Sequence, residues 1–286
     1  MKPIGILANL EKPQVPRVIR PLLRQLQRLH QTVVMERALA ESLGLAGGRS
    51  LQEIGARCRL LIVLGGDGTV LRAAREIHPH EVPLLPVNFG KLGFLAAVPP
   101  GKLSRVLPLA LKGKVGLTVH STLEVSLTSQ GQLQKGLVAL NDAVISRGAV
   151  SRVVQLELLV DGEFLNSYFC DGIIFSTATG STAYSLSAGG PIVAPQARVF
   201  AITPICSHTL SNRSLMVADR STVETRIISQ PEELFLSLDG QRMIRLNPND
   251  RVIVTIGKYR VRMVTLPGTS FFQLVRRKLR WVGSNI

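Results

Sequence analysis

The sequence predicts two domains of different fold class: a doubly wound parallel α/β domain and, after it, a β-sandwich. Apolar strands and amphipathic helices alternate over the first 115 residues, which is typical of a parallel sheet covered by helices. From Gly116 the pattern changes to short runs of alternating apolar and polar residues, joined in two places by Asp-Gly turns. We therefore expect an α/β domain over 1–115, a β-sandwich over 116–268, and a last helix over 269–286 that packs on the first domain.

The elements of the first domain follow from apolar periodicity. Pro21 lies inside the first amphipathic helix, which therefore either begins there or is kinked. The sequence Pro99-Pro100-Gly101 interrupts the pattern before a further helix that ends near Leu111. The expected strands are 4–8, 32–35, 60–64 and 83–87, and the expected helices are 16–29, 51–56, 70–77 and the one ending near 111.

The second domain is predicted from strand-like runs and their turns. Asp161-Gly162 and Asp239-Gly240 each lie between two such runs, which is the strongest short signal for a β-hairpin. The expected strands are 117–127, 137–145, 153–160, 163–169, 199–203, 223–228, 252–256 and 259–264. The last helix is expected to begin at Phe271.

Composition limits the classes of function. The net charge of +15 indicates a polyanionic partner, but the basic residues are scattered and aromatic residues make up only 5%, so we expect no nucleic-acid interface. The one dense basic cluster, 276–281, is more typical of a solvated helix face. No apolar run reaches a membrane span and no signal peptide is recognisable, so we expect no membrane association. Three widely separated cysteines predict a reducing, cytoplasmic environment.

The most informative segment is 60–69, Leu-Leu-Ile-Val-Leu-Gly-Gly-Asp-Gly-Thr. An apolar strand leads through a glycine turn into a helix with Val70, Leu71, Ala74 and Ile77 on one stripe. A helix N-terminus after a glycine turn favours phosphate, which makes Gly65, Gly66, Gly68 and Thr69 candidate phosphate-binding residues. Asp67 adds a carboxylate that a phosphate cradle alone does not need, and it indicates chemistry or a metal; the alternative is a plain helix cap. The segment is neither a dinucleotide fingerprint nor a Walker motif.

Three other segments carry candidate ligand-binding groups. Asn88 follows the next buried strand and is expected beside the Asp67 turn. Asn141 and Asp142 form an amide–carboxylate pair that can hold two ribose hydroxyls, although such a pair also favours an ordinary β-turn. The segment 171–191 has more hydroxyl groups than one short helix needs for capping, around a single Tyr184, and we interpret it as a ligand-binding wall.

Together these segments resemble the NAD kinase family over most of the chain. Gly-Gly-Asp-Gly-Thr alone is shared with diacylglycerol-type lipid kinases, whereas the core Thr-Gly-Ser-Thr-Ala-Tyr of the hydroxyl-rich segment is specific. The segments that carry the resemblance are 65–69, 88–90, 92–95, 141–142, 171–191, 203–204, 207–211 and 239–241.

The resemblance implies an α/β domain and a β-sandwich with the active site between them. It also implies transfer of the γ-phosphoryl group of ATP, with polyphosphate as the alternative donor, to the 2′-hydroxyl of the adenosine ribose of NAD, giving NADP. By the resemblance Asp67 is the catalytic base that takes the hydroxyl proton. The implied substrate-binding residues are Asp67, Gly68, Asn141, Asp142, Arg152, Asp171, Thr182, Ala183, Tyr184, Ser185, Leu186, Ser187 and Gln241.

The resemblance also bears on the donor and the assembly. Phe169 stands where several bacterial relatives carry a basic residue, a departure that concerns how the protein holds a phosphate. The sequence shows no obvious metal cage, so we expect Mg²⁺ to arrive with ATP. The family resemblance suggests a homo-oligomer. His208 follows the expected strand 199–203, and we favour a structural role for it over a role in ligand binding.

Two other functions remain to be weighed. A lipid kinase that shares the glycine motif would need an apolar surface for its substrate, whereas the segment 176–187 is rich in hydroxyl groups. A non-catalytic nucleotide sensor or nucleic-acid-binding module would bind without turnover, and Asp67 would then be dispensable.

Overall fold

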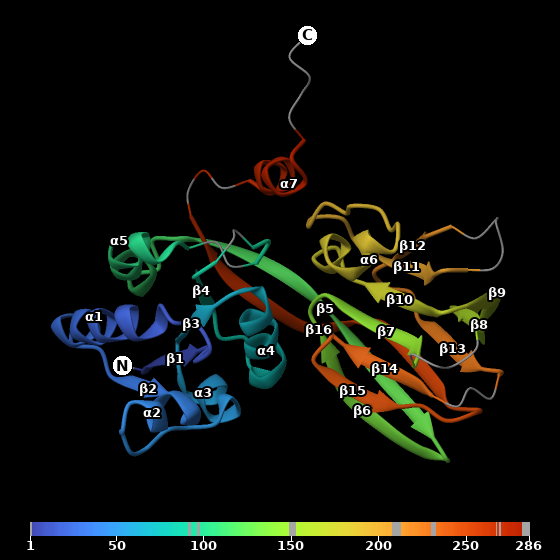
Figure 1. The fold of residues 1–286 in the computed structure, drawn as a ribbon, viewed down its shortest axis with the longest axis horizontal. Helices are drawn as coiled ribbons and strands as arrows, with labels where there is room; N and C mark the ends of the chain where they lie inside the picture. Colours follow the sequence, from blue (N-terminus) through green and yellow to red (C-terminus); the bar gives the residue numbers. More distant parts are fainter. Residues whose placement is uncertain are drawn as a thin grey trace, which may run out of the picture. The chain divides into compact units, whose positions relative to one another are not determined.

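The computed structural model describes residues 2–90, 93–95, 98–148, 153–207, 213–229, 233–266, 268 and 270–281. The chain divides into two compact units, which we call the α/β unit (1–120 and 261–286) and the sandwich unit (121–260) (Figure 1). Two long strands, β5 (Gly116–Ser129) and β16 (Arg251–Thr265), contribute residues to both units.

The α/β unit is built on a parallel sheet with the strand order β2-β1-β3-β4-β16. The chain adds β2 on one side of β1 and β3 on the other, so the order reverses between β1 and β3. Apart from β5 and β16, the elements of this unit are β1 (Ile4–Ala8), α1 (Val15–Arg28), β2 (Val33–Met35), α2 (Arg37–Ser42), α3 (Leu51–Arg57), β3 (Leu60–Gly65), α4 (Asp67–Ile77), β4 (Leu84–Asn88), α5 (Pro100–Leu111) and α7 (Phe271–Leu279).

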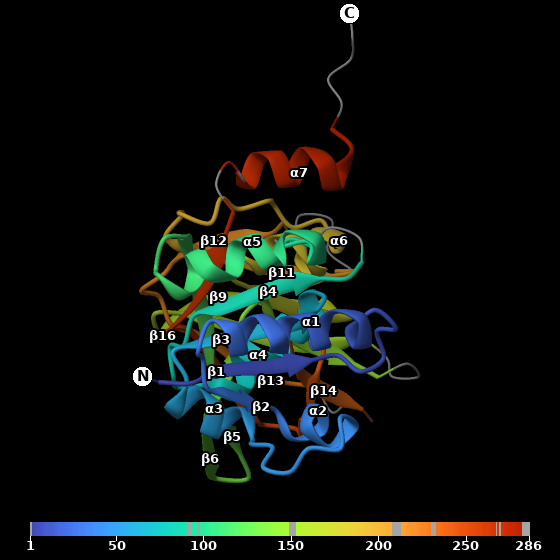
Figure 2. The ribbon, with the colours of Figure 1, turned by 90° about the vertical axis from the view of Figure 1, so that its left-hand side faces the viewer.

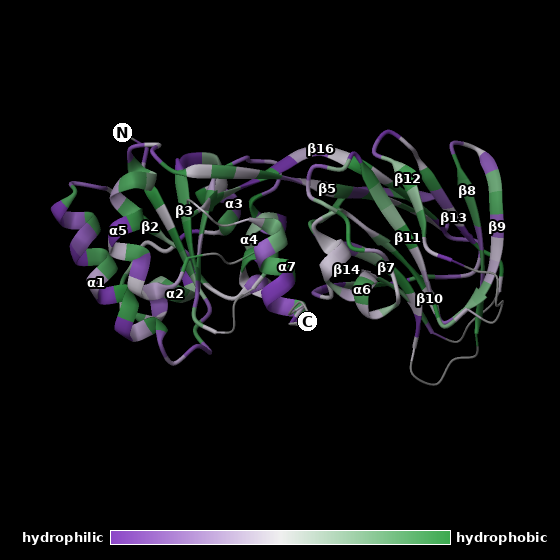
Figure 3. Ribbon diagram, turned by 90° about the horizontal axis from the view of Figure 1, so that it is seen from above, coloured by the Kyte–Doolittle hydropathy of each residue, from purple (hydrophilic) through white to green (hydrophobic). Residues whose placement is uncertain are grey.

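Helices cover both faces of this sheet because its strands are apolar on both sides. On one face Ile6, Ile62 and Leu85 form a core with residues of α1 and α5 such as Ile19 and Leu107. Helices α3 and α4, which contact each other, lie on the other face (Figures 1 and 2). In Figure 3 helix α1 alternates between hydrophilic and hydrophobic segments, as an amphipathic surface helix should. The predicted doubly wound α/β domain is confirmed.

Several predicted boundaries in this unit were wrong. Helix α4 already begins at Asp67 because Gly66 serves as its N-cap. Helix α1 begins at Val15 and continues through Pro21, which lies on its exposed side. The structure also contains helix α2, which the sequence analysis missed; the Glu36 side chain caps it by accepting from the backbone N–H of Leu39 at 3.2 Å. Pro100 begins helix α5, because a proline is favourable in the first turn of a helix.

The sandwich unit consists of two sheets that share one core. The first has the order β6-β5-β16-β13-β8-β9 and the second β12-β11-β10-β7-β14-β15. Buried residues of both sheets, among them Leu156, Phe175 and Leu236, belong to the same apolar cluster, which confirms the predicted sandwich. Its remaining elements are β6 (Gln132–Ala139), β7 (Asp142–Arg147), β8 (Val154–Val160), β9 (Glu163–Cys170), β10 (Gly172–Ser176), η1 (Gly180–Thr182), α6 (Tyr184–Ser187), β11 (Val199–Ile205), β12 (Leu215–Ala218), β13 (Val223–Ile227), β14 (Leu234–Leu238) and β15 (Arg242–Arg245).

Both predicted hairpins are confirmed, since Asp161 and Asp239 have φ values of 53° and 52° and a glycine with positive φ follows each. Two strand predictions were wrong. The run 137–145 is two strands, β6 and β7, in different sheets, and the runs 252–256 and 259–264 form the single strand β16. The strand continues through Gly257, where a Cβ atom would lie 3.2 Å from side-chain atoms of Thr122 and Glu124.

The C-terminal helix α7 is grouped with the α/β unit. Ser270 and Gln273 form a capping box at its start, and its side chain Val275 is buried. Lys278 lies 5.5 Å from the centre of the Phe94 ring. Among the described residues we find no helix with the length and apolar character that crossing a membrane requires.

Candidate functional site

The turn after β3 leaves its backbone open to close approach by a ligand. A Cβ atom at Gly65 would lie 2.2 Å from the hydroxyl oxygen of Thr69, so only glycine fits there. Gly66 has open space around its Cβ position and caps helix α4, whose first turn contains the exposed Gly68. Thr69 itself is buried beneath the turn. The helix N-terminus and bare backbone form an anion-binding arrangement.

Asp67 is held by the segment that follows β4. Its Oδ2 accepts a hydrogen bond from the backbone N–H of Phe94 at 2.8 Å, and its Oδ1 accepts one from that of Leu95 at 3.3 Å. A Cβ atom at Gly93 would lie 1.9 Å from Oδ1 of Asp67, so Gly93 gives the carboxylate its space. The structure thus fixes both oxygens of the predicted base. The sequence alone did not indicate that Gly93 lies against Asp67.

The predicted position of Asn88 is confirmed. Gly65 of β3 pairs with Asn88 of β4, so the two strands end side by side at the carboxyl edge of the sheet. The Asn88 side chain accepts a hydrogen bond from the N–H of Gly90 at 3.0 Å, which shapes the following turn. This edge adjoins the reversal of strand order between β1 and β3, where open α/β sheets bind their ligands.

In the sandwich unit, Asn141 and Asp142 lie where the chain passes from one sheet to the other. Asp142 begins β7 and is buried, with 5% of its surface exposed. The carboxylate of Asp239 accepts from the N–H groups of Leu140, Asn141 and Asp142, at 2.9, 2.7 and 3.2 Å. The side-chain Oδ1 of Asn141 is buried and has no hydrogen-bond partner in the described part of the chain. Buried polar atoms without a hydrogen-bond partner are rare in proteins.

Burial and a neighbouring carboxylate make the carboxyl group of Asp142 unusually weakly acidic. Burial in the first place, and repulsion from Asp239 in the second, raise the pKa of Asp142 from its ordinary 3.8 to about 7. Near neutral pH its carboxyl group is therefore present both with and without its proton, and the protonated form can donate a hydrogen bond as well as accept one.

Replacement of this group should change how stability depends on pH. Between pH 4 and 7 the folded wild type keeps a proton on Asp142 that the unfolded chain releases, so its stability falls as the pH rises through this range. Asp142→Asn should remove this contribution, which is on the order of 2–4 kcal/mol, and should unfold at a higher temperature than wild type at pH 8. Thermal unfolding of both proteins at pH 4 and pH 8 measures the effect. If the unfolding temperatures of the two proteins differed by the same amount at pH 4 and at pH 8, the raised pKa of Asp142 would be contradicted.

Half of the eight hydroxyl groups in the segment 176–187 are buried, which narrows the interpretation of this segment as a ligand-binding wall. Four of them are buried and hydrogen-bonded within the sandwich unit: Ser176, Thr177, Ser181 and Ser185. Thr177 donates from its hydroxyl to the carbonyl of Leu140 at 2.7 Å and from its N–H to that of Asn141 at 2.9 Å. These groups tie the segment to the start of β7, a role that hydroxyl count alone does not reveal.

The exposed side chains of the segment follow in the helix α6. Tyr184 has 46% of its surface exposed and Ser187 is also exposed, whereas Ala183 and Leu186 are half-buried. The hydroxyl of Thr182 donates to the carbonyl of Thr179 at 3.2 Å. A ring with one open face at the end of a tightly anchored turn can stack on a planar group.

The other predicted residues have these positions. Asp171, between β9 and β10, accepts from Nε of Arg147 at 2.7 Å, an ion pair that the sequence did not indicate. Gln241 is exposed in the β14–β15 hairpin, where its N–H donates to the carbonyl of Leu238 at 3.0 Å. Phe169, on β9, is 46% exposed. Arg152 and His208 lie outside the described residues.

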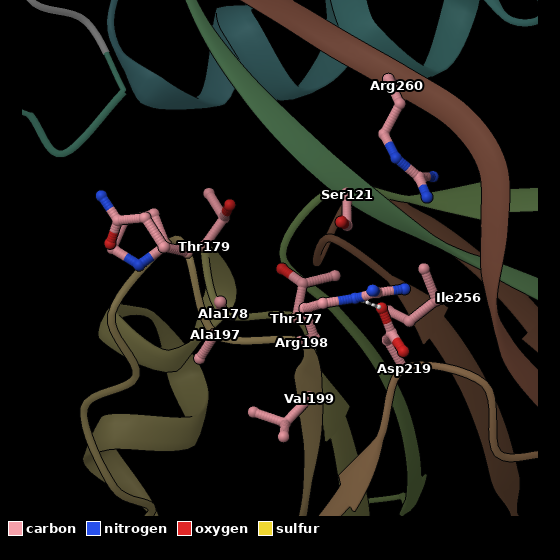
Figure 4. A pocket seen from close by; sticks show the side chains of 12 residues that line it. Ser121, Thr177, Ala178, Thr179, Ala197, Arg198, Val199, Asp219, Ile256 and Arg260 are labelled. Atoms are coloured by element: carbon pink, nitrogen blue, oxygen red, sulfur yellow. Dashed lines mark hydrogen bonds and ion pairs between the residues drawn. The ribbon is translucent and has the colours of Figure 1, made fainter.

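A cavity of about 220 Å³ lies within the sandwich unit (Figure 4). Arg260 on β16 and Arg198 line it together with hydroxyl groups of Ser121, Thr177 and Thr179. Asp219 pairs with Arg198 at 2.9 Å and neutralises one of the two positive charges. Of the residues that line this cavity, Thr177, Ala178 and Thr179 belong to the segment that the sequence analysis interpreted as a ligand-binding wall.

A metal site made of side chains alone is not apparent in the part of the chain that the structure describes, where no three His, Cys, Asp or Glu residues are grouped for coordination. Oxygen donors at the β3 edge, such as the Asp67 carboxylate, suit Mg²⁺ only in combination with other oxygen ligands such as phosphates.

Comparison with known proteins identifies relatives that match over most of the chain. Models of the ATP-NAD kinase N-terminal and C-terminal domains match residues 4–115 and 140–266. An NAD kinase of Desulforamulus reducens is 37% identical over 281 residues, which cover 98% of each chain. An NAD kinase of Aquifex aeolicus is 44% identical over 222 residues, covering 78% of this chain and 81% of that protein.

Solved structures show the same fold. The crystal structure of yeast NADH kinase complexed with NADH has a TM-score of 0.89 and 27% identity, covering 99% of this chain and 89% of its own. The crystal structure of an NAD kinase from Archaeoglobus fulgidus in complex with ATP has a TM-score of 0.76 at 21% identity. The match covers 98% of this chain and 99% of that one, and it supports the assignment of the fold. Both domain models match in order, and the relatives match over most of their length. The chain therefore belongs to the NAD kinase family.

Proposed function

We propose that Asp67 is the catalytic base with which this protein performs the reaction of its family, the ATP-dependent phosphorylation of NAD to NADP. The γ-phosphoryl group passes to the 2′-hydroxyl of the adenosine ribose, and Asp67 takes the proton of that hydroxyl. The observation that carries the proposal is the fixed carboxylate of Asp67, which two backbone N–H groups hold at the start of helix α4.

Phosphoryl transfer needs orientation and charge neutralisation more than covalent chemistry, because its transition state is loose. The backbone of Gly65, Gly66 and Gly68 and the start of α4 can supply N–H donors to phosphate oxygens, with Thr69 and Asn88 shaping the turns around them. A fixed carboxylate beside such donors has the geometry of a general base that needs no rearrangement during the reaction.

We assign the acceptor nucleotide to the Asn141–Asp142 turn and the segment after β10. Within the described residues the side-chain oxygen of Asn141 has no hydrogen-bond partner, and Asp142 can donate or accept near neutral pH, which suits the hydroxyls of a ribose. Tyr184 offers an exposed ring to the adenine, next to Thr182, Ala183, Ser185, Leu186 and Ser187. Ser185 can contribute through its backbone, because its hydroxyl is bonded to that of Thr203 at 3.2 Å. Asp171, Arg152 and Gln241 complete the set of residues that we propose to bind the acceptor nucleotide.

The test is NADP formation by the purified protein from NAD, with Mg²⁺ and either ATP or polyphosphate. We expect turnover with ATP and none after addition of EDTA, because Mg²⁺ bound to the donor phosphates neutralises the charge that moves in the reaction. NADH in place of NAD, and polyphosphate in place of ATP, measure the two specificities. Binding of NAD without any turnover would exclude the kinase function and favour a sensor.

We further propose a homo-oligomer in the cytoplasm. Strand β9 ends its sheet and exposes Phe164 and Phe169, of which 57% and 46% are accessible, and such an edge can pair with a second copy. The thiols of Cys58, Cys170 and Cys206 are free, as in a reducing compartment. Sedimentation of the wild type and of Phe164→Ser tests the first part, since a monomeric wild type would contradict it.

A further inference from the structure

Asp239 connects two distant parts of the sandwich unit at the proposed nucleotide site. It lies at the tip of the β14–β15 hairpin with 8% of its surface exposed. Its carboxylate accepts three backbone hydrogen bonds from residues 140–142, and its own N–H donates to the carbonyl of Asp142 at 2.9 Å. One side chain therefore fixes the whole Asn141–Asp142 turn.

These N–H groups need an acceptor because the chain changes sheets at this point. β6 pairs with β5 in one sheet, whereas β7 pairs with β10 and β14 in the other, so the linking residues 140–141 lie outside both ladders. Buried backbone donors without partners are costly, and a carboxylate can accept several at once. From the opposite side, the carbonyl of Asn141 accepts from the N–H of Thr177 at 2.9 Å. The turn is thus held at both its donors and its acceptors.

We propose that Asp239 is a positioning residue for the acceptor dinucleotide: its three hydrogen bonds fix the direction in which Asn141 and Asp142 present their side chains to the ribose. This inference rests on the proposed role of Asn141 and Asp142. Asp239 needs no contact with the substrate for this function. It acts through the main chain of the residues that make the contact.

The negative charge of Asp239 has a second consequence. It is one of the two causes that raise the pKa of Asp142, the other and larger being burial. Loss of that charge should therefore lower the pKa of Asp142, and with it the pH at which the affinity for NAD changes. A residue whose charge does not act on Asp142 would leave this pH unchanged.

Asp239→Asn tests the inference with little change of shape. Asn adopts the left-handed backbone conformation at least as readily as Asp, so the turn at φ 52° should persist. The carboxylate of Asp239 accepts from residues 140–142 with both of its oxygens, whereas the amide of an Asn has one acceptor oxygen. The NH₂ group of the amide would face one of these backbone N–H groups, so at least one hydrogen bond would be lost. We expect the KM and the Kd for NAD to rise about 10–100-fold, since hydrogen bonds to charged groups are the stronger ones, with a smaller change in kcat. The midpoint of the pH dependence of NAD binding should move to lower pH.

The chain provides a matched control at Asp161. This residue occupies the other Asp-Gly hairpin with φ 53°, and its side chain accepts from the N–H of Thr222 at 2.8 Å on the surface of the unit. Asp161→Asn should leave the affinity for NAD and its pH midpoint at wild-type values. Equal effects of the two substitutions would show a general loss of hairpin structure and would overturn the inference.

Asp142→Asn separates the inference from the proposed function. If it weakens NAD binding while Asp239→Asn leaves binding and its pH midpoint unchanged, Asp239 has no positioning role. If neither substitution affects NAD binding in an active enzyme, the assignment of the ribose to Asn141 and Asp142 is wrong, and the inference fails with it. Wild-type protein without NAD kinase activity would instead refute the proposed function.

Discussion

Asp67→Asn is expected to lower kcat for NADP formation about 10²–10⁴-fold, the usual contribution of a positioned general base. An amide cannot take the proton of the ribose hydroxyl, but it keeps the shape of the carboxylate, so helix α4 and the glycine turn should persist. Initial rates of NADP formation at saturating NAD and MgATP measure the effect. Near-normal turnover would remove Asp67 from the role of base.

The structure shows that this substitution also changes an anchor, so the rate alone is not sufficient. Both oxygens of Asp67 accept backbone hydrogen bonds, and the NH₂ group of an Asn would face one of the two donors, Phe94 or Leu95. If Asp67 acts as base, NAD binding should change much less than kcat. A parallel loss of both would indicate that Asp67 mainly holds the segment 93–95. Glu81→Gln serves as control, because this carboxylate pairs with Arg262 at 2.9 Å and has no proposed role.

Gly180→Ala is expected to disturb the nucleotide site and the stability of the sandwich unit together. A Cβ atom at this position would lie 2.0 Å from the carbonyl oxygen of Asn141 and 2.7 Å from its Cα. Backbone cannot move aside as a flexible side chain can, so either the turn after β10 or the start of β7 must shift. We expect a loss of about 1–3 kcal/mol in stability, typical of overpacking, and weaker binding of NAD. Thermal unfolding and an NAD titration measure the two effects.

Gly101→Ala is the matched control for the added methyl group. Gly101 lies in helix α5 of the α/β unit, and its Cβ position is open, with no atom within 4 Å among those described. Alanine favours a helix over glycine by roughly 1 kcal/mol, so this variant should be at least as stable as wild type and should bind NAD normally. Wild-type stability and NAD affinity in Gly180→Ala would contradict the predicted close approach to Asn141.

The sequence determined the features that depend on neighbours in the chain. Periods of 3.6 and 2 residues indicated most of the helices and strands of both units, although helix α2 was missed and three strand runs were divided wrongly. The Asp-Gly pairs at 161–162 and 239–240 indicated the two hairpins because their backbone conformations are local properties. The glycine turn at 65–68 and its position after a buried strand were also recognisable. Asn88 could be placed beside it, since consecutive parallel strands end at the same sheet edge.

Only the tertiary structure decided which groups meet across the chain. Asp67 is held by residues 27 and 28 positions away, and Asp239 by residues 97 to 99 positions away, distances at which a local pattern carries no information. For the same reason the hydroxyls of the segment 176–185 looked available for a ligand, although four of them are satisfied by partners inside the unit. Sequence specifies which groups could bond, but burial and close approach, which folding alone creates, determine which bonds form.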